Sequence, residues 1–230
     1  MATLVYFPGM GGNAGVSPAL AQLDGFDVVI PAVPGFAGEA GFSVPTSYLD
    51  WIVAACDAFD ATGATDDGPV TLIGASVGGM LAAELAALRP EIVSKLALLA
   101  PFGIADEDRP GYDYWSKRGP DRLPHLFAKG VPEAFEQRFA DRGPEEAPVA
   151  VYIADVAMAS LIWPLGDRDT RFRLHRIGCP MTVLMGGQDE LIPPSVGELW
   201  GGATVIDGAG HLLEWDTPDE VAAELRAFLA

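Results

Sequence analysis

Short apolar runs recur along the chain, and each has the length of a β-strand. Several are rich in Val, Ile and Leu and lack polar alternation, which is typical of strands covered on both faces. The runs are Thr3–Phe7, Asp27–Ile30, Val70–Ile73, Leu96–Ala100, Met181–Met185 and Ala203–Ile206. Helical patterns lie between them, and this alternation predicts an α/β fold with an open, mostly parallel sheet of about six strands flanked by helices.

Two of the predicted helices have recognisable starting points. The first follows Ser47, which forms a plausible capping pair with Asp50. The residues expected on the buried face of this helix are Leu49, Ile52, Val53, Cys56 and Phe59. The last helix begins at Thr217, with Pro218 in its first turn and Glu220 at the reciprocal capping position.

One long segment interrupts the alternation of strands and helices. Residues 102–177 are rich in Pro, Gly, Trp, Tyr and charged side chains, and they contain several helical patches. The segment is too long for an ordinary connection within a compact domain. We therefore predict a core made of residues 1–101 and 178–230, with residues 102–177 inserted as a helical cap over one end of the sheet.

Composition narrows the classes of partner. The chain has 230 residues, half of them apolar, and a formal net charge of −18. This length suits one domain, or one domain with an insertion. The negative charge repels phosphate backbones and argues against a nucleic acid partner. No apolar run reaches the roughly 18 residues that a membrane span needs, so we expect no membrane partner.

The cysteine and histidine content predicts a reduced protein without a metal. Cys56 and Cys179 are the two cysteines, and they fit a cytoplasmic protein, although one disulfide is an open alternative. No Cys/His cluster has the spacing of metal ligands. The first residues are interpreted as a mature strand rather than a signal peptide. We expect a cytoplasmic protein with no metal.

A serine occupies the joint between the third apolar run and the alanine-rich stretch that follows it. The sequence there is Gly74-Ala75-Ser76-Val77-Gly78. In an open parallel sheet, ligands bind beyond the carboxyl ends of the strands, so Ser76 is expected in a cleft. A tight strand-to-helix turn crowds the backbone, and glycines two residues before and after the serine relieve that crowding. The N–H of Val77, at the start of a helix, is placed to bind a developing oxyanion.

A base and an acid for this serine follow two later strands. His211 comes after the last apolar run, in a loop with Gly208 and Gly210, and is the candidate base. Asp189 follows the run Met181–Met185 and is the candidate group that orients the imidazole. The open alternatives for the acid are Glu190, Asp106 and Glu214. The chain order is nucleophile, acid, base.

With these three elements the sequence resembles the α/β-hydrolase superfamily, in the capped branch that includes esterases, lactonases and carbon–carbon bond hydrolases. The matching stretches are "TLIGASVGG", "VLMGGQDELIP" and "GAGHLLEWDTPDEV". The resemblance covers residues 3–101 and 178–230. The leading hairpin of many members is expected to be absent, since the sequence starts at the first strand.

The resemblance also implies a second oxyanion donor. The family's oxyanion loop follows the first central strand, where this chain has Pro8-Gly9-Met10-Gly11-Gly12. By that resemblance the second donor is the N–H of Met10. Pro8 stands where the family usually has a histidine, which puts the loop geometry in question more than the reaction. The implied activity is acyl transfer to water by a serine hydrolase that needs no cofactor.

Three alternative interpretations of these residues are compatible with the sequence. Residues Gly9 to Ala14 also fit the dinucleotide pattern G-x-G-x-x-A, but no acid follows the second strand to bind a ribose hydroxyl. A catalytically silent ligand-binding protein could share the fold. Lyase or transferase chemistry could use the same three residues.

The substrate is expected to be a small, largely apolar molecule bound under the cap. Contacts are expected from Gly9 and Phe36 near the serine and from Trp163 in the cap. The other aromatic and apolar cap residues are more readily explained as the cap's own core. An arginine cluster at residues 168–176 could bind a substrate carboxylate, although pairing with the protein's own acids is the simpler reading. A homodimer is compatible with the sequence.

Overall fold

A single parallel sheet organises the chain. The computed structural model describes residues 2–10, 12, 15–39, 45–117 and 119–230. All described strand pairs are parallel, and the strand order is β2-β1-β3-β4-β5-β6. The strands are β1 (Ala2–Phe7), β2 (Phe26–Val29), β3 (Val70–Ala75), β4 (Val93–Leu99), β5 (Met181–Gly186) and β6 (Thr204–Ile206). The predicted α/β class and strand number are confirmed.

Helices cover both faces of this sheet and one of its ends. The α-helices are α1 (Tyr48–Asp60), α2 (Ser76–Leu88), α3 (Glu133–Glu136), α4 (Gly143–Ile162), α5 (Leu213–Asp216) and α6 (Pro218–Leu229). The 3₁₀ helices are η1 (Leu20–Gln22), η2 (Pro90–Ile92), η3 (Tyr114–Ser116), η4 (Gly119–Leu126), η5 (Ala140–Arg142), η6 (Thr170–Phe172), η7 (Leu174–Arg176) and η8 (Pro194–Trp200).

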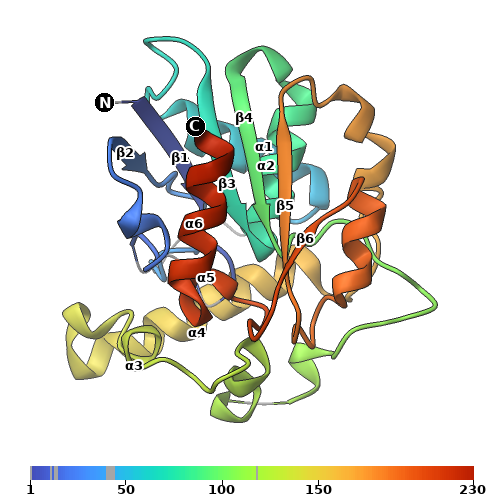
Figure 1. Cartoon of the computed structure of the whole chain (residues 1–230). Coiled ribbons are helices and arrows are strands. Elements are labelled where there is room, and N and C mark those ends of the chain that lie inside the picture. Colours follow the sequence, from blue (N-terminus) through green and yellow to red (C-terminus); the bar gives the residue numbers. More distant parts are fainter. Residues whose placement is uncertain (1, 11, 13–14, 40–44, 118) are drawn as a thin grey trace.

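Alternating side chains of the strands divide the core into two layers. Val5 and Phe7 of β1 pack with residues of α1 and α2 on one face. Leu4 and Tyr6 pack with α6 and η1 on the other. Figure 1 shows α6 in front of the sheet and α1 and α2 behind it. A strand buried on both faces needs apolar residues at every position, which explains the absence of polar alternation in the sequence.

The segment between β4 and β5 lies across one end of the sheet. Figure 1 shows α3 and α4 below the carboxyl ends of the strands. Helix α4 packs tightly on the loops there, because a Cβ on Gly12 would lie 2.8 Å from the Cβ of Ala154 and one on Gly38 only 2.6 Å from the Cβ of Ala150. We call residues 102–177 the connecting segment. It shares the core cluster of α1 and α2 through residues such as Tyr114 and Met158.

Strand order also fixes where a site can form. The chain passes from β1 to β2 at one edge, whereas β3 leads to β4 on the opposite side. The switch point between β1 and β3 leaves their two carboxyl-end loops adjacent, and this is where open α/β sheets bind ligands. Residues 11, 13 and 14 of the loop after β1, which include part of the G-x-G-x-x-A pattern, lie outside the described residues.

Two local predictions about the helices are confirmed. Ser47 is the N-cap of α1, and its hydroxyl accepts from the N–H of Asp50 while the Asp50 carboxylate accepts from the N–H of Ser47. Helix α6 starts at Pro218, with Thr217 as its N-cap residue. At α1, the side chains of Ser47 and Asp50 bind free backbone N–H groups of the first turn. At α6, Pro218 has no N–H that would need a partner.

Of two other local predictions, the buried face of α1 is wrong in part and the capping pair at α6 is wrong. Ile52 and Phe59 are buried as predicted, and Cys56 packs against the core. The buried face of α1 carries Trp51, Ile52, Ala55 and Phe59, whereas Leu49 and Val53 are 67% and 50% exposed. Trp51 is the largest apolar side chain of this helix, and packing it against Phe36 rotates Leu49 and Val53 outward.

At α6, the Thr217 hydroxyl makes no capping bond and donates instead to the carbonyl of Leu213 at 3.3 Å. Helix α5 ends at Asp216, so this hydroxyl serves the end of α5 rather than the start of α6. The backbone N–H of Thr217 donates to the carbonyl of Leu213 at 3.0 Å, so the reciprocal capping role expected for Glu220 is absent.

Candidate active site

Ser76 lies in a strained turn between β3 and α2. Its φ of +55° is in the left-handed region, which residues other than glycine rarely adopt. The backbone around it is crowded, because a Cβ on Gly74 would lie 2.5 Å from the carbonyl oxygen of Gly78, and one on Gly78 would lie 2.2 Å from that of Phe7. The two glycines therefore permit a turn that pushes the Ser76 side chain out of the sheet.

The loop after β1 closes against this serine. A Cβ on Gly9 would lie 2.8 Å from the Cβ of Ser76, so this position tolerates no side chain without movement. Met10 and Val77, the two expected oxyanion donors, are both buried beside this approach. Val77 is the second residue of α2, where backbone N–H groups have no partner inside the helix. The loop and the helix start thus converge on Ser76 from two adjacent strands.

His211 connects Ser76 to Asp189. Its Nε2 lies 2.8 Å from Ser76 Oγ, and its Nδ1 lies 2.8 Å from Asp189 Oδ2. A carboxylate only accepts, so Nδ1 carries the ring proton and Nε2 is left to accept from the serine hydroxyl. The three predicted residues are therefore assembled from the loops after β3, β5 and β6.

The Asp189 carboxylate is fixed by its own loop. Its Oδ1 accepts from the N–H groups of Leu191 and Ile192 at 2.8 Å and 2.9 Å, which leaves Oδ2 for His211. Asp189 is 6% exposed, and Ser76 and His211 have no exposed surface. A buried carboxylate with three donors is held in one orientation, so it also holds the imidazole in one orientation.

The three alternative acids make other contacts. Glu190 Oε2 lies 2.5 Å from Nδ1 of His125, and Asp106 Oδ2 accepts from Nε of Arg109 at 2.8 Å. Glu214 is buried and accepts from the Tyr6 hydroxyl at 3.3 Å. Burial raises the pKa of the Glu214 carboxyl to about 7. Asp189 is the acid that contacts His211.

The histidine loop is tied to the connecting segment. Asp216 Oδ2 accepts from the N–H groups of Gly210 and Ala128 at 2.8 Å and 2.7 Å, and the N–H of Leu212 donates to the carbonyl of Leu126 at 3.0 Å. A Cβ on Gly210 would lie 2.7 Å from the backbone nitrogen of Ala128. The position of His211 therefore depends on how the connecting segment packs.

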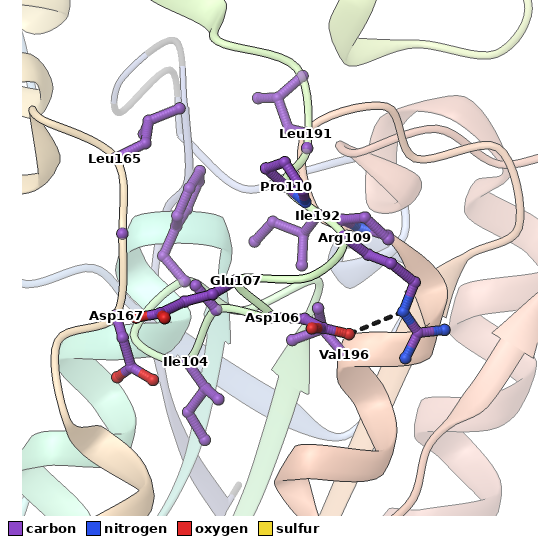
Figure 2. A pocket seen from close by; sticks show the side chains of 15 residues that line it. Ile104, Asp106, Glu107, Arg109, Pro110, Leu165, Asp167, Leu191, Ile192 and Val196 are labelled. Atoms are coloured by element: carbon purple, nitrogen blue, oxygen red, sulfur yellow. Dashed lines mark hydrogen bonds and ion pairs between the residues drawn. The ribbon is translucent and has the colours of Figure 1, made fainter.

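A cavity of about 340 Å³ adjoins this arrangement. Apolar side chains from three loops line most of it: Phe102, Ile104, Leu165, Leu191, Ile192 and Val196. Phe102 also borders the triad, since its N–H donates to the carbonyl of Ser76 at 3.1 Å and its ring packs edge-on against that of His211 at 5.4 Å between centroids. Figure 2 shows the cavity with four charged side chains among the residues that line it.

Comparison with known proteins identifies the family. The family model described as "Alpha/beta hydrolase family" matches residues 4–224. The chain belongs to the alpha/beta hydrolase family. It is therefore a hydrolase built on this fold, and the resemblance inferred from its sequence motifs is confirmed.

Curated relatives of this hydrolase include methyl ester esterases. The pimeloyl-[acyl-carrier protein] methyl ester esterase of Neisseria meningitidis serogroup B is 27% identical over 189 residues, which cover 75% of this chain and 72% of the relative. The serogroup A protein of the same name is 28% identical over 72% of this chain and 54% of its own length. This chain thus spans about half the length of the serogroup A relative that it matches.

Solved structures share the fold at lower identity. A serine hydrolase involved in carbazole degradation has a TM-score of 0.77 at 19% identity, with 100% of this chain and 91% of that chain covered. The 2-hydroxy-6-oxo-6-phenylhexa-2,4-dienoate hydrolase of Rhodococcus sp. strain RHA1 has a TM-score of 0.70 at 19% identity, with 99% and 90% covered. These likenesses support the architecture of the hydrolase.

The three residues expected to contact substrate, Gly9, Phe36 and Trp163, lie outside the lining of this cavity. Gly9 lies against Ser76, as described above. Phe36 is buried and packs against Trp51, with ring centroids 6.1 Å apart. Trp163 is 49% exposed and packs edge-on against Trp115. Trp163 is the C-cap residue of α4, and its contact with a substrate stays a prediction.

The arginines of residues 168–176 are engaged by the protein itself. Arg173 donates to both carboxylate oxygens of the buried Glu84, and Arg171 lies 3.5 Å from Asp167. Arg168 and Arg176 donate to backbone carbonyls. Pairing with the protein's own acids is therefore confirmed for Arg171 and Arg173, whereas Arg168 and Arg176 bind backbone carbonyls instead.

Sequence reasoning missed Phe102 and Asp216. Phe102 could have been found, because it directly follows β4 at the carboxyl edge that also carries Ser76. Asp216 gave no such signal, since its role depends on a contact with Ala128 from a distant part of the chain.

Neither a cluster of metal ligands nor a membrane-spanning helix is found among the described residues. Within that part of the chain, no group of three or more His, Cys, Asp or Glu side chains is placed to hold a metal ion. None of the helices among those residues has both the length and the apolar character that crossing a bilayer demands. Cys56 and Cys179 are both unpaired.

Proposed function

We propose that this α/β hydrolase is a serine hydrolase that cleaves an ester-like bond of a small, largely apolar substrate through an acyl-enzyme. The observation that carries the proposal is the position of His211 between Ser76 and Asp189, with both separations at 2.8 Å. A serine hydroxyl is a weak nucleophile until a base removes its proton. An oriented neutral imidazole within hydrogen-bonding distance supplies that base.

The reaction begins with attack of Ser76 Oγ on the substrate carbonyl carbon. His211 Nε2 takes the hydroxyl proton as the new C–O bond forms, and Asp189 stabilises the imidazolium. The tetrahedral intermediate collapses as the alcohol leaves, and His211 returns the proton to the leaving oxygen. His211 then takes a proton from water as the water oxygen attacks the acyl carbon. The bond from that carbon to Ser76 Oγ breaks, His211 returns the proton to Oγ, and the carboxylic acid and free Ser76 result.

The negative charge that develops on the carbonyl oxygen needs donors in place before the reaction. The N–H groups of Val77 and Met10 are assigned this role, Val77 because it starts α2 and Met10 because its loop approaches Ser76. Removing one such donor lowers the rate by about 10²–10³-fold. No cofactor takes part in any of these steps.

Two observations favour an ester of modest size. The curated relatives named above are methyl ester esterases, which supports an ester as the bond that is cleaved. The cavity next to the triad is about 340 Å³, at the lower end of the range for small-molecule pockets. Its mostly apolar lining suits an aliphatic chain. The connecting segment acts as the cap over this site.

Hydrolysis of a panel of short-chain carboxylic esters, including methyl esters, and lactones tests the proposal. The wild-type protein should release acid from at least one of them, and Ser76→Ala should abolish that activity. Release of the alcohol without formation of the free carboxylic acid would instead indicate a transferase, which passes the acyl group to an acceptor other than water. Failure of the whole panel would favour a ligand-binding protein that retains the fold without the reaction.

A further inference from the structure

The cavity beside the triad has an unusual distribution of charge for a mostly apolar site. Three carboxylates line it, those of Asp106, Glu107 and Asp167, whereas Arg109 is the one basic residue in the lining. The residues that line the cavity therefore carry a net formal charge of −2. Glu107 is exposed to solvent, whereas the side chains of Asp106 and Asp167 are only 16% and 11% exposed, so two carboxylates are largely withdrawn from water beside a mostly apolar cavity.

These carboxylates differ in how far their charge is compensated. Asp106 is paired with Arg109, whose Nε lies 2.8 Å from its Oδ2. Asp167 Oδ1 accepts from the N–H of Asp169, and its Oδ2 lies 3.5 Å from Arg171. Glu107 is exposed and has no hydrogen bond or ion pair to another described residue. Figure 2 shows the Glu107 side chain directed away from Arg109, toward the side of the cavity where Asp167 lies.

The nearby cations are already committed to other partners. Arg109 is held by Asp106, Arg173 is held by the buried Glu84, and Arg168 donates to the carbonyls of Ile162 and Pro164. An anionic group entering the cavity would therefore meet three carboxylates and one guanidinium that is already paired. Glu107 is exposed at the edge of the cavity, so its charge would oppose that of the entering group through partly solvated space, where salt screens the repulsion.

We propose that this cavity binds the acyl chain of the substrate and that its carboxylates, above all Glu107, select chains with a neutral or cationic end and reject chains that end in an anion. This inference rests on the proposed function, because it assigns the cavity to the reaction at Ser76. Phe102 connects the two, since it lines the cavity and packs against His211. Glu107 is a specificity-determining residue in this account and touches no reacting atom.

Labelling of Ser76 by three matched fluorophosphonates tests this proposal directly. The probes carry the same six-carbon chain, which ends in a methyl group, an ammonium group or a carboxylate. Intact mass gives the second-order rate constant of labelling for each. The ammonium probe should react at least as fast as the methyl probe, and the carboxylate probe about tenfold or more slowly at low ionic strength. The difference should shrink in high salt because exposed charges are screened.

Two variants separate the cavity from the overall charge of the protein. Glu107→Gln should raise the rate for the carboxylate probe, relative to that for the methyl probe, by about threefold. Glu224→Gln removes the same charge from the exposed side of α6, away from the cavity, and should leave that ratio unchanged.

The outcomes distinguish this proposal from the proposed function. Labelling of Ser76 at equal rates by all three probes, or fastest by the carboxylate probe, would overturn the charge selection and leave the serine hydrolase intact. An unchanged ratio in Glu107→Gln would also overturn it. Absence of Ser76 labelling by every probe would overturn the proposed function, and the charge selection with it.

Discussion

His211 Nε2 lies 2.8 Å from Ser76 Oγ, although the two residues are 135 positions apart in the chain. Neither has any exposed surface, so the hydrogen bond between them is shielded from water. The parallel sheet produces this meeting, because the carboxyl ends of β3 and β6 face the same edge. The connecting segment then holds the histidine loop through Asp216 and Ala128.

Replacing Asp189 by Asn should slow the reaction far more than replacing its neighbour. Two backbone N–H groups bind Oδ1, so the amide oxygen of Asn would occupy that position and its NH₂ group would face His211 Nδ1. The imidazole would be forced into the tautomer with its proton on Nε2, which cannot accept from Ser76. Loss of kcat should be about 10²–10⁴-fold, measured on the best ester of the panel.

Glu190→Gln is the matched control for that variant. It removes the same charge one residue away, from a side chain that contacts His125 rather than His211. Its kcat should stay within about threefold of wild type, in line with the small energies of exposed ion pairs. Comparable losses in Asp189→Asn and Glu190→Gln would contradict the assignment of the acid.

Gly78→Ala should destabilise the protein because the new methyl group has no room. Its Cβ would lie 2.2 Å from the carbonyl oxygen of Phe7 and 2.4 Å from that of Pro8, both backbone atoms that cannot move alone. The free energy of unfolding, measured with urea, should fall by at least about 2 kcal/mol. Gly178→Ala has no neighbour closer than 4.0 Å and should change it by less than about 0.5 kcal/mol. Equal stabilities would show that the turn at Ser76 is less crowded than described.

Glu214 should make stability fall as the pH rises through the neutral range. Its folded-state pKa of about 7 lies above the ordinary value of 4.5, so the folded protein binds this proton more tightly than the unfolded chain does. The stabilisation is complete below about pH 4.5 and is lost as the pH rises to about 7. Between about pH 5 and pH 8, the unfolding free energy of Glu214→Gln should therefore gain about 2–3 kcal/mol relative to that of wild type.

The pH dependence is the informative quantity for Glu214, and not the absolute stability. Tyr6 can still donate to the amide oxygen, but Oε2 has no hydrogen-bond partner among the described residues, and an NH₂ group placed there adds a cost that does not vary with pH. Glu224→Gln controls for the change in net charge. If the curves of Glu214→Gln and wild type ran parallel from pH 5 to 8, the buried carboxyl would not titrate near neutrality.

The fold and the three triad positions could be read from the sequence because they depend on local patterns. Each strand is a continuous apolar run, and Ser76, Asp189 and His211 each follow such a run at the same sheet edge. Glycines at positions 74 and 78 mark a turn that few other residues permit. The α1 start was also local, since Ser47 and Asp50 satisfy each other's backbone groups.

Features that the sequence did not predict depend on contacts between distant parts of the chain. Leu49 and Val53 fit a helical face, but the partner that decides which face is buried is Phe36, which contacts Trp51. For Trp163 the contact with substrate stays a prediction, and its packing against Trp115 is a contact that the sequence did not indicate. β4 begins at Val93, three residues before the apolar run, because Lys95 reaches the carbonyls of Phe228 and Leu229 instead of interrupting the strand.

Intact-mass measurement after treatment with a fluorophosphonate tests the central claim most directly, since it reports whether His211 activates Ser76. We predict one adduct per wild-type chain, none on Ser76→Ala, and labelling slowed by orders of magnitude in His211→Ala. Equal labelling of wild type and Ser76→Ala, or labelling of His211→Ala at the wild-type rate, would contradict the assignment of nucleophile and base.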